Sequence, residues 1–143
     1  MTRISSASLS IYSDTHKASD VSAIMGLEPS TLWEKGDRRI DTKREREYKP
    51  RTQSGWHFDA DSSLNDPADD SGFAALRVLL TDLANKSAAL GSLRPHYRTV
   101  IRWIGETGTT QGNFAMDADL IVAMGALGCE FWGTIIEDDP DEA

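Results

Sequence analysis

Residues 97–136 carry the clearest structural signals in the chain: YRTVIRWIGETGTTQGNFAMDADLIVAMGALGCEFWGTII. The opening part is rich in β-branched and aromatic residues, a composition typical of strands. The glycines between Gly105 and Gly112 predict a turn, and Phe114–Met116 is predicted as a short return strand. The first half of the stretch therefore predicts a hairpin.

The second half of this stretch predicts a helix followed by a strand. Asp117 can accept backbone N–H bonds as an N-cap, and Gly128 tolerates the positive φ that ends many helices. Between them, apolar residues recur at spacings of three and four and share one helix face. Alternation in Cys129–Ile136 predicts a strand with Trp132 on its more exposed face. The predicted buried face of that strand carries Cys129, Phe131, Gly133 and Ile135.

The rest of the chain adds two strands, two helices and one long excursion. Residues 6–12 alternate apolar and polar side chains, as in a strand that is covered on one face. A short helix is predicted over 19–25, and a second strand over 55–60. A leucine-rich helix is predicted over 72–89. Its apolar stripe consists of Phe73, Leu76, Leu79, Leu80, Leu83 and Leu90. Between the first helix and the second strand, the charged segment 34–54 is predicted to be a loop.

The predicted order is β-α-β-α-β-β-α-β, which favours an α+β fold. We expect a two-layer sandwich, with an antiparallel or mixed sheet and helices on one face. A ferredoxin-like arrangement of each half is one option. The length of 143 residues favours one domain, which we place at residues 1–136. Residues 137–143 (EDDPDEA) are predicted to form an acidic, disordered tail.

Composition narrows the classes of function. The net charge of −8 argues against non-specific binding to nucleic acid, which depends on neutralising phosphates. No apolar run approaches the ~20 residues that cross a membrane, and the first residues lack the apolar core of a secretory signal. A single cysteine excludes an internal disulfide. We therefore expect a cytoplasmic protein that binds neither nucleic acid nor membrane.

Several segments, taken in order, resemble a known bacterial family. They are Ile24–Pro29 (IMGLEP), Trp33–Arg38 (WEKGDR), Ser54–Trp56 (SGW), the leucine-rich helix and Leu127–Phe131 (LGCEF). Over roughly residues 6–136 the chain is similar to the uncharacterised family called domain of unknown function 4279. The segment between Gly36 and Trp56 is longer and more charged than the family pattern. The last strand also ends differently, in WGTII. The resemblance implies the fold and no activity, with a loose link to toxin–immunity settings.

Common catalytic and cofactor signatures are missing from the sequence. It has no phosphate loop, dinucleotide-binding glycine motif, CxxC, HExxH or nucleophile elbow. His57, Asp59 and Asp61 could share one side of a strand, but we interpret them as its solvated face. Residues 59–70 resemble a calcium loop, yet Leu64 replaces the required glycine. We therefore predict no catalytic residue, no metal site and no cofactor, and favour a protein that is not an enzyme.

The strongest candidate site lies beside the charged segment 34–54. Eight Lys and Arg residues against five acids make residues 34–51 locally basic. Exposed Trp and Arg side chains dominate the energetics of protein interfaces. The candidate binding residues are Trp33, Lys35, Arg38, Arg39, Trp56 and His57. The alternative for Trp33 is a structural role at the sheet edge, and for Trp56 a place in the core.

Three functions remain open from the sequence. We favour a non-enzymatic protein-interaction module of immunity or regulatory type, with another protein as its partner. The alternative is a small-molecule-binding protein or enzyme, with its site between the sheet and the loop 34–54. The third is a homodimer formed by pairing edge strands across the interface.

Overall fold

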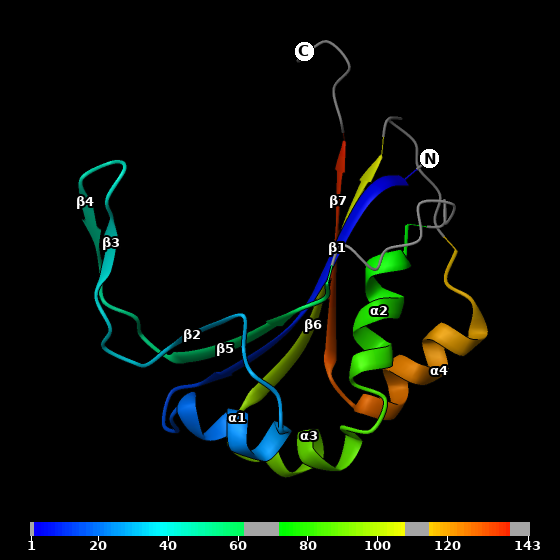
Figure 1. Cartoon of the computed structure of the whole chain (residues 1–143), viewed down its shortest axis with the longest axis horizontal. Helices are drawn as coiled ribbons and strands as arrows, with labels where there is room; N and C mark the ends of the chain where they lie inside the picture. The colour runs from blue at the N-terminus through cyan, green and yellow to red at the C-terminus, as the bar shows by residue number, and fades with distance from the viewer. Residues whose placement is uncertain (1, 62–71, 108–114, 138–143) are drawn as a thin grey trace.

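The computed structural model describes residues 2–61, 72–107 and 115–137 (Figure 1). Strands and helices alternate irregularly along the chain. In chain order the elements are β1 (Thr2–Ser13), α1 (Ser19–Met25), β2 (Thr31–Trp33), β3 (Arg39–Asp41), β4 (Arg46–Tyr48), β5 (Ser54–Asp59), α2 (Ala74–Asp82), α3 (Ser87–Leu93), β6 (Arg98–Thr107), α4 (Ala118–Leu127) and β7 (Glu130–Glu137).

The main sheet has five strands in the order β2-β5-β1-β6-β7, and the predicted α+β class is confirmed. Strand β1 lies at its centre and pairs antiparallel with both β5 and β6. Strands β6 and β7 are parallel neighbours joined through α4, as a β-α-β crossover requires. Strand β2 also runs parallel to β1, but β5 lies between them, so the β1-α1-β2 unit is split. The sheet is therefore mixed.

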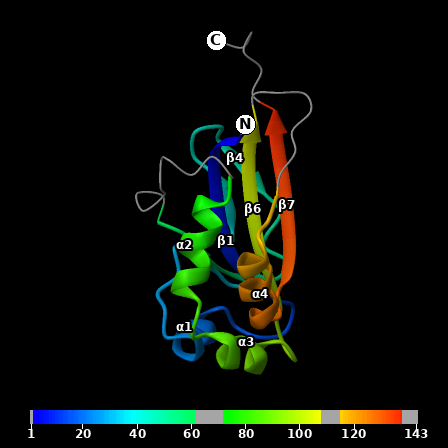
Figure 2. The ribbon, with the colours of Figure 1, turned by 90° about the vertical axis from the view of Figure 1, so that its right-hand side faces the viewer.

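The helices lie on one side of the sheet and the β3–β4 hairpin extends from the other side (Figures 1 and 2). Alternation along β1 decides which side chains face the helices: Leu9 and Ile11 are buried there, while Tyr12 points to the other face and is half-buried. Strands β5 and β6 contribute Trp56 and Trp103 to the helix side in the same way. Trp103 stacks on Phe73, with ring centroids 4.8 Å apart. The core is thus a single layer between sheet and helices.

The predicted apolar stripe of the leucine-rich helix is buried in full, but the helix is broken into two. Helix α2 ends at Asp82 and α3 begins at Ser87. The intervening turn contains Asn85, a residue with low helix propensity. The break lets α3 change direction, and Leu90 and Leu93 are both buried. In one continuous helix, Leu90 and Leu93 would instead lie further along the axis of α2.

Two further expectations about the last third of the chain need correction. The predicted turn between Gly105 and Gly112 and the start of the return strand fall mainly on residues 108–114, outside the described part. Ala115 and Met116 are not in a strand, and β6 pairs with β7 in parallel. The predicted buried face of β7 is also partly exposed, because β7 is an edge strand; Phe131 is 37% and Ile135 45% exposed.

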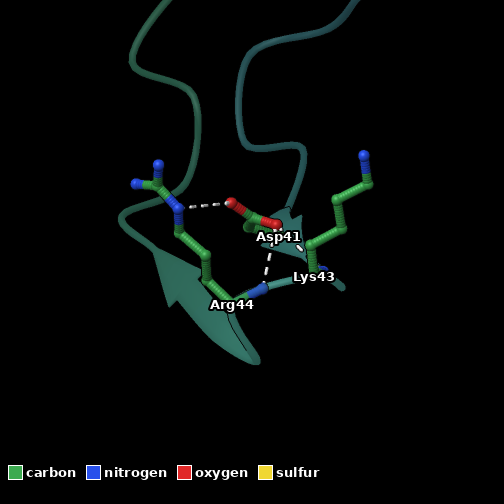
Figure 3. Close-up of polar contacts among 3 residues, drawn as sticks. All are labelled: Asp41, Lys43 and Arg44. Carbon is green, nitrogen blue, oxygen red and sulfur yellow. Dashed lines mark hydrogen bonds and ion pairs between the residues drawn. The ribbon is translucent and has the colours of Figure 1, made fainter.

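The segment 34–54, predicted to be a loop, contains the short hairpin β3–β4. We call residues 36–51, the hairpin together with its base, the arm. Its base is joined by backbone hydrogen bonds from Gly36 N to Arg51 O (2.8 Å) and from Arg51 N to Asp37 O (2.9 Å). Its tip is shaped by Asp41, whose carboxylate accepts bonds from the backbone N–H groups of Lys43 (3.0 Å) and Arg44 (3.2 Å) (Figure 3). The arm therefore has a defined shape and base.

The predicted boundary between domain and tail, after residue 136, lies inside strand β7. Strand β7 includes Glu137, so the acidic tail contributes its first residue to the sheet. Residues 138–143 of that tail and residues 62–70 of the calcium-like loop lie outside the described residues. Among the helices of the described chain, none has the length and apolar content needed to cross a bilayer.

Candidate functional site

The face of the sheet opposite the helices, here called the open face, presents aromatic and cationic side chains from neighbouring strands. Tyr12 of β1 pairs with Arg98 of β6, and Ser8 pairs with Arg102. Arg102 in turn is opposite Trp132 of β7. Because directly opposite residues in a ladder project to the same side, these side chains meet across the strands. The open face is therefore built by register, from residues far apart in the chain.

A row of cation–π contacts crosses the open face. The Arg102 guanidinium carbon lies 5.7 Å from the centroid of the Tyr12 ring and 5.1 Å from that of Trp132. Arg102 also donates a hydrogen bond to the Tyr12 hydroxyl at 3.2 Å. Arg98 lies 5.2 Å from the Trp132 ring and makes a 2.6 Å ion pair with Glu130. Each contact lies within the ~6 Å range in which a ring attracts a cation.

Trp132 remains accessible despite these contacts. Its side chain belongs to an edge strand, and the residue is 49% exposed. Ile104 and Ile136, on the same face by alternation, are 43% and 51% exposed. Ile104 pairs with Thr134, the position between Trp132 and Ile136 on that face of β7. Three large apolar side chains thus share one solvent-facing area beside two arginines.

The other end of the open face is built around Trp33 on edge strand β2. Trp33 pairs with Gly55, and a Cβ atom at position 55 would lie 2.2 Å from the indole Cζ2. Only a glycine lets the indole lie this close to β5. The Trp33 Nε1 donates to the Gln53 carbonyl at 3.0 Å, and the Arg51 guanidinium lies 4.0 Å from the indole ring. The backbone approach and these two contacts hold the ring in place.

His57 is the titratable group at the centre of this end. Its Nδ1 is 2.9 Å from Ser10 Oγ, and its ring lies 4.8 Å from that of Trp33. Burial lowers the pKa of His57 below 6.5; Asp59 opposes that shift, while Arg102 and Arg51 add to it. The imidazole is therefore neutral at pH 7. Its Nε2 is buried and has no hydrogen-bond partner among the residues described.

A cavity of about 410 Å³ lies between the arm and this end of the open face. Its cationic lining consists of Arg39, Lys49 and Arg51. Its aromatic lining consists of Tyr12, Trp33 and His57. An adjoining cavity of about 440 Å³ shares Trp33, Arg39 and Arg51 but also has Asp37 and Asp41 in its wall. The two cavities therefore differ in charge.

The structure brings together three of the six predicted binding residues. Trp33, His57 and Arg39 line the first cavity, and Arg38 lines the adjoining one. Lys35 is exposed elsewhere and donates to the Asp14 carbonyl at 3.2 Å.

Trp56 has no surface at the site. It is 0% exposed on the helix side and donates to Ser22 Oγ at 3.1 Å. Strand alternation explains this, because the neighbouring residue, His57, takes the open face.

Several residues of the site were not among the predicted ones. Tyr12, Arg98 and Arg102 come from β1 and β6, far from the charged segment in sequence, whereas Arg51 lies within that segment but was not among the predicted residues. For Tyr12, strand alternation was a usable signal, since this residue was predicted on the polar side of the first strand. Their meeting depends on the order of strands in the sheet.

The described residues contain no cluster of three His, Cys, Asp or Glu side chains that could hold a metal ion. The lone cysteine, Cys129, is half-buried, and burial is the main cause that raises its thiol pKa. What the described geometry offers is a binding surface: stacked arginines, exposed aromatics and a cationic cavity.

The fold and this surface define a single α+β sandwich with an uncovered sheet face. Residues 2–136 match the family described as Domain of unknown function (DUF4279), and the chain belongs to that family. The match spans nearly the whole chain and agrees with the resemblance seen in the sequence. No curated protein and no solved structure matches the chain.

Proposed function

We propose that this protein is a non-enzymatic module that binds another protein through the open face of its sheet, at β6 and β7. The observation that carries this proposal is the group of exposed apolar side chains, Ile104, Trp132 and Ile136, beside Arg98 and Arg102. Sheet faces in compact domains are normally covered when they carry large apolar groups. Here no described element covers them.

The chemistry of this area suits a protein partner. Tryptophan, tyrosine and arginine are enriched among the residues that dominate protein–protein binding energy. Two guanidinium groups, those of Arg98 and Arg102, contact the Trp132 ring, and Arg102 also donates a hydrogen bond to the Tyr12 hydroxyl. Side chains that are ordered before binding lose less conformational entropy when a partner docks. The exposed apolar side chains, bordered by two arginines, therefore form a surface that is already ordered before a partner binds.

The kind of partner is part of the proposal. The family resemblance implies a regulatory or immunity-type role, in which the module binds one specific protein. A cytoplasmic location belongs to the same proposal, supported by a single cysteine that leaves no internal disulfide to form.

The test is affinity capture from native lysate, followed by titration of the purified partner. Arg102→Ala/Trp132→Ala should weaken binding by about 30-fold or more, as expected for residues worth at least ~2 kcal/mol. Ile121→Ala/Val122→Ala is the matched control, because these residues are exposed on α4 at 55% and 70%. A partner that loses affinity only in the α4 variant would overturn the proposal.

A second candidate is a homodimer formed through β7. This strand has one neighbour, β6, so its outer edge is unpaired among the described residues. Unpaired edges with exposed apolar side chains are templates for strand addition. Light scattering across a concentration series tests this candidate: a dimer whose dissociation constant rises in Ile135→Lys supports it, and a monomer at all concentrations removes it.

A further inference from the structure

We propose that the cavity between the arm and the sheet binds a small molecule that carries a phosphate or carboxylate group on a flat ring. This site goes beyond the proposed protein interface, since it lies at the β2–β5 end of the open face. Its volume of about 410 Å³ is in the range of small-ligand sites, ~300–1,000 Å³. A bare inorganic anion would fill only a small part of it.

Uncompensated positive charge defines the acidic half of the ligand. Arg39, Lys49 and Arg51 line the cavity, and none of the three forms an ion pair with any described residue. By contrast, Arg38 on the same arm is paired with Glu47 at 2.9 Å. One cavity is thus lined by three cations that have no ion-pair partner among the described residues, in a chain with a net charge of −8. Together they attract an anion and repel a cation.

Comparison with the adjoining cavity indicates which part of the site would hold the anion. Asp37 and Asp41 line that cavity together with Arg38 and Arg39. Its carboxylates compete with any bound anion for the same cations. The first cavity has no carboxylate in its lining. The anion is therefore placed on the side of Lys49 and Tyr12.

Arg51 is the residue best prepared to hold the anion. Its guanidinium lies against the Trp33 indole, and its backbone is fixed at both N–H and C=O by the base of the arm. Stacking on an indole leaves the N–H edge of a guanidinium available, and that edge matches the two oxygens of a carboxylate or phosphate. Lys49 adds a point charge, and Arg39 adds a second set of donors.

The rest of the lining favours a flat ring attached to the anion. Tyr12, Trp33 and His57 contribute aromatic surface, and their rings are already in mutual contact, with Tyr12 5.5 Å from His57 at 79°. His57 is neutral, so it adds a ring without adding charge. Rings that are already packed need little ordering when a ligand binds. The site thus combines an anion subsite with an aromatic wall.

Phenyl phosphate is the probe, with inorganic phosphate and phenol as its two halves, measured by NMR titration of the full chain. Phenyl phosphate should bind saturably and at least about tenfold tighter than either half, because charged hydrogen bonds and ring contacts add. Benzoate in place of phenyl phosphate distinguishes a carboxylate from a phosphate preference. Equal binding of phenol, or no saturable binding of either phenyl phosphate or benzoate, would overturn the proposal.

Variants locate the site independently of the proposed protein interface. Arg51→Gln should weaken phenyl phosphate by about tenfold or more. Arg39→Gln/Lys49→Gln changes only exposed side chains of the arm and should have a similar effect. Lys43→Gln, at the tip of the arm (Figure 3), removes the same charge away from the cavity and should change affinity by less than about twofold. Equal losses in Lys43→Gln would show general attraction to a basic arm and contradict a defined site.

Discussion

The two faces of the sheet use the same strands for different purposes. On β5, Trp56 is 0% exposed beneath the helices, whereas the next residue, His57, lies on the open face beside Trp33. On β6, Trp103 is buried and stacked on Phe73, whereas Arg102 lies between two aromatic rings in partial contact with solvent. The helix side of these strands therefore carries fully buried aromatic rings, whereas the open face carries groups that combine apolar area with hydrogen-bonding capacity.

The energetic scale of the two faces differs accordingly. A fully buried aromatic side chain contributes several kcal/mol, since its removal leaves a cavity that neighbours cannot fill. A cation–π contact near solvent contributes about 0.5–1 kcal/mol. The open face can therefore change to suit a ligand or partner at little cost in stability, while the helix side cannot.

Removing one tryptophan from each face should show the largest contrast. Trp56→Ala is expected to lower the free energy of unfolding by about 3–5 kcal/mol, because the indole is fully buried and its N–H is bonded to Ser22. Trp132→Ala should cost less than about 1 kcal/mol. Urea denaturation measures both. Similar losses in the two variants would contradict the proposed division between faces.

Two glycines give the next contrast. Gly55→Ala places a Cβ 2.2 Å from the Trp33 indole, so the ring must move, and we expect a loss of about 1–3 kcal/mol with a changed near-ultraviolet circular dichroism signal. Gly125→Ala, in α4, meets nothing within 4 Å and should stabilise by about 0.5–1 kcal/mol. If Gly55→Ala leaves stability and the aromatic signal unchanged, the indole is not packed on β5.

The pH dependence of stability should carry a contribution from His57. Its pKa in the folded protein is lowered from 6.5, so the unfolded chain binds more protons as pH falls through that value. The free energy of unfolding should therefore fall as the pH drops below 6.5, and this contribution should level off once the folded-state pKa is passed. In His57→Gln this part of the loss should vanish. Thermal melts from pH 8 to 5 test it, and a variant with the wild-type pH profile would exclude the imidazole as the source.

The smallest effect on stability is expected from breaking the surface ion pair between Arg38 and Glu47 of the arm. Arg38 and Glu47 are 69% and 56% exposed, so Glu47→Gln should change stability by less than about 0.5 kcal/mol. The backbone bonds between Gly36, Asp37 and Arg51 hold the base instead. Amide hydrogen exchange at Gly36 and Arg51 should remain slow in the variant. Fast exchange there would show that the ion pair, rather than the base, keeps the arm folded.

Local patterns predicted much of the fold. Alternation in the first strand placed Leu9 and Ile11 in the core, and the leucine stripe over 73–90 is buried as predicted. At α4 the predicted caps are confirmed: Asp117 accepts a hydrogen bond from Leu120 N at 2.9 Å, and Gly128 has φ 68°. These features depend on neighbouring residues and are therefore readable from sequence. The short strands β2, β3 and β4, of three residues each, are too brief for any period to show.

The site was less predictable because it depends on strand order. Trp33, Arg39 and His57 were among the predicted binding residues and share a cavity. Arg102 and Trp132 join the open face only because β6 lies between β1 and β7 in the sheet. Trp56 and His57 are adjacent in sequence and separated by the full thickness of the sheet, which alternation alone predicts once the covered face is known.

Oxidative footprinting of the complex tests the role of the open face most directly. With the captured partner bound, hydroxyl-radical oxidation of Trp132 should fall strongly, while oxidation of Met124, on α4, should be unchanged. Trp132 lies on the open face and is 49% exposed in the free protein, whereas Met124 belongs to α4, one of the helices on the other side of the sheet (Figures 1 and 2). Protection of Met124 with no protection of Trp132 would place the partner on the helices and contradict recognition through the open face.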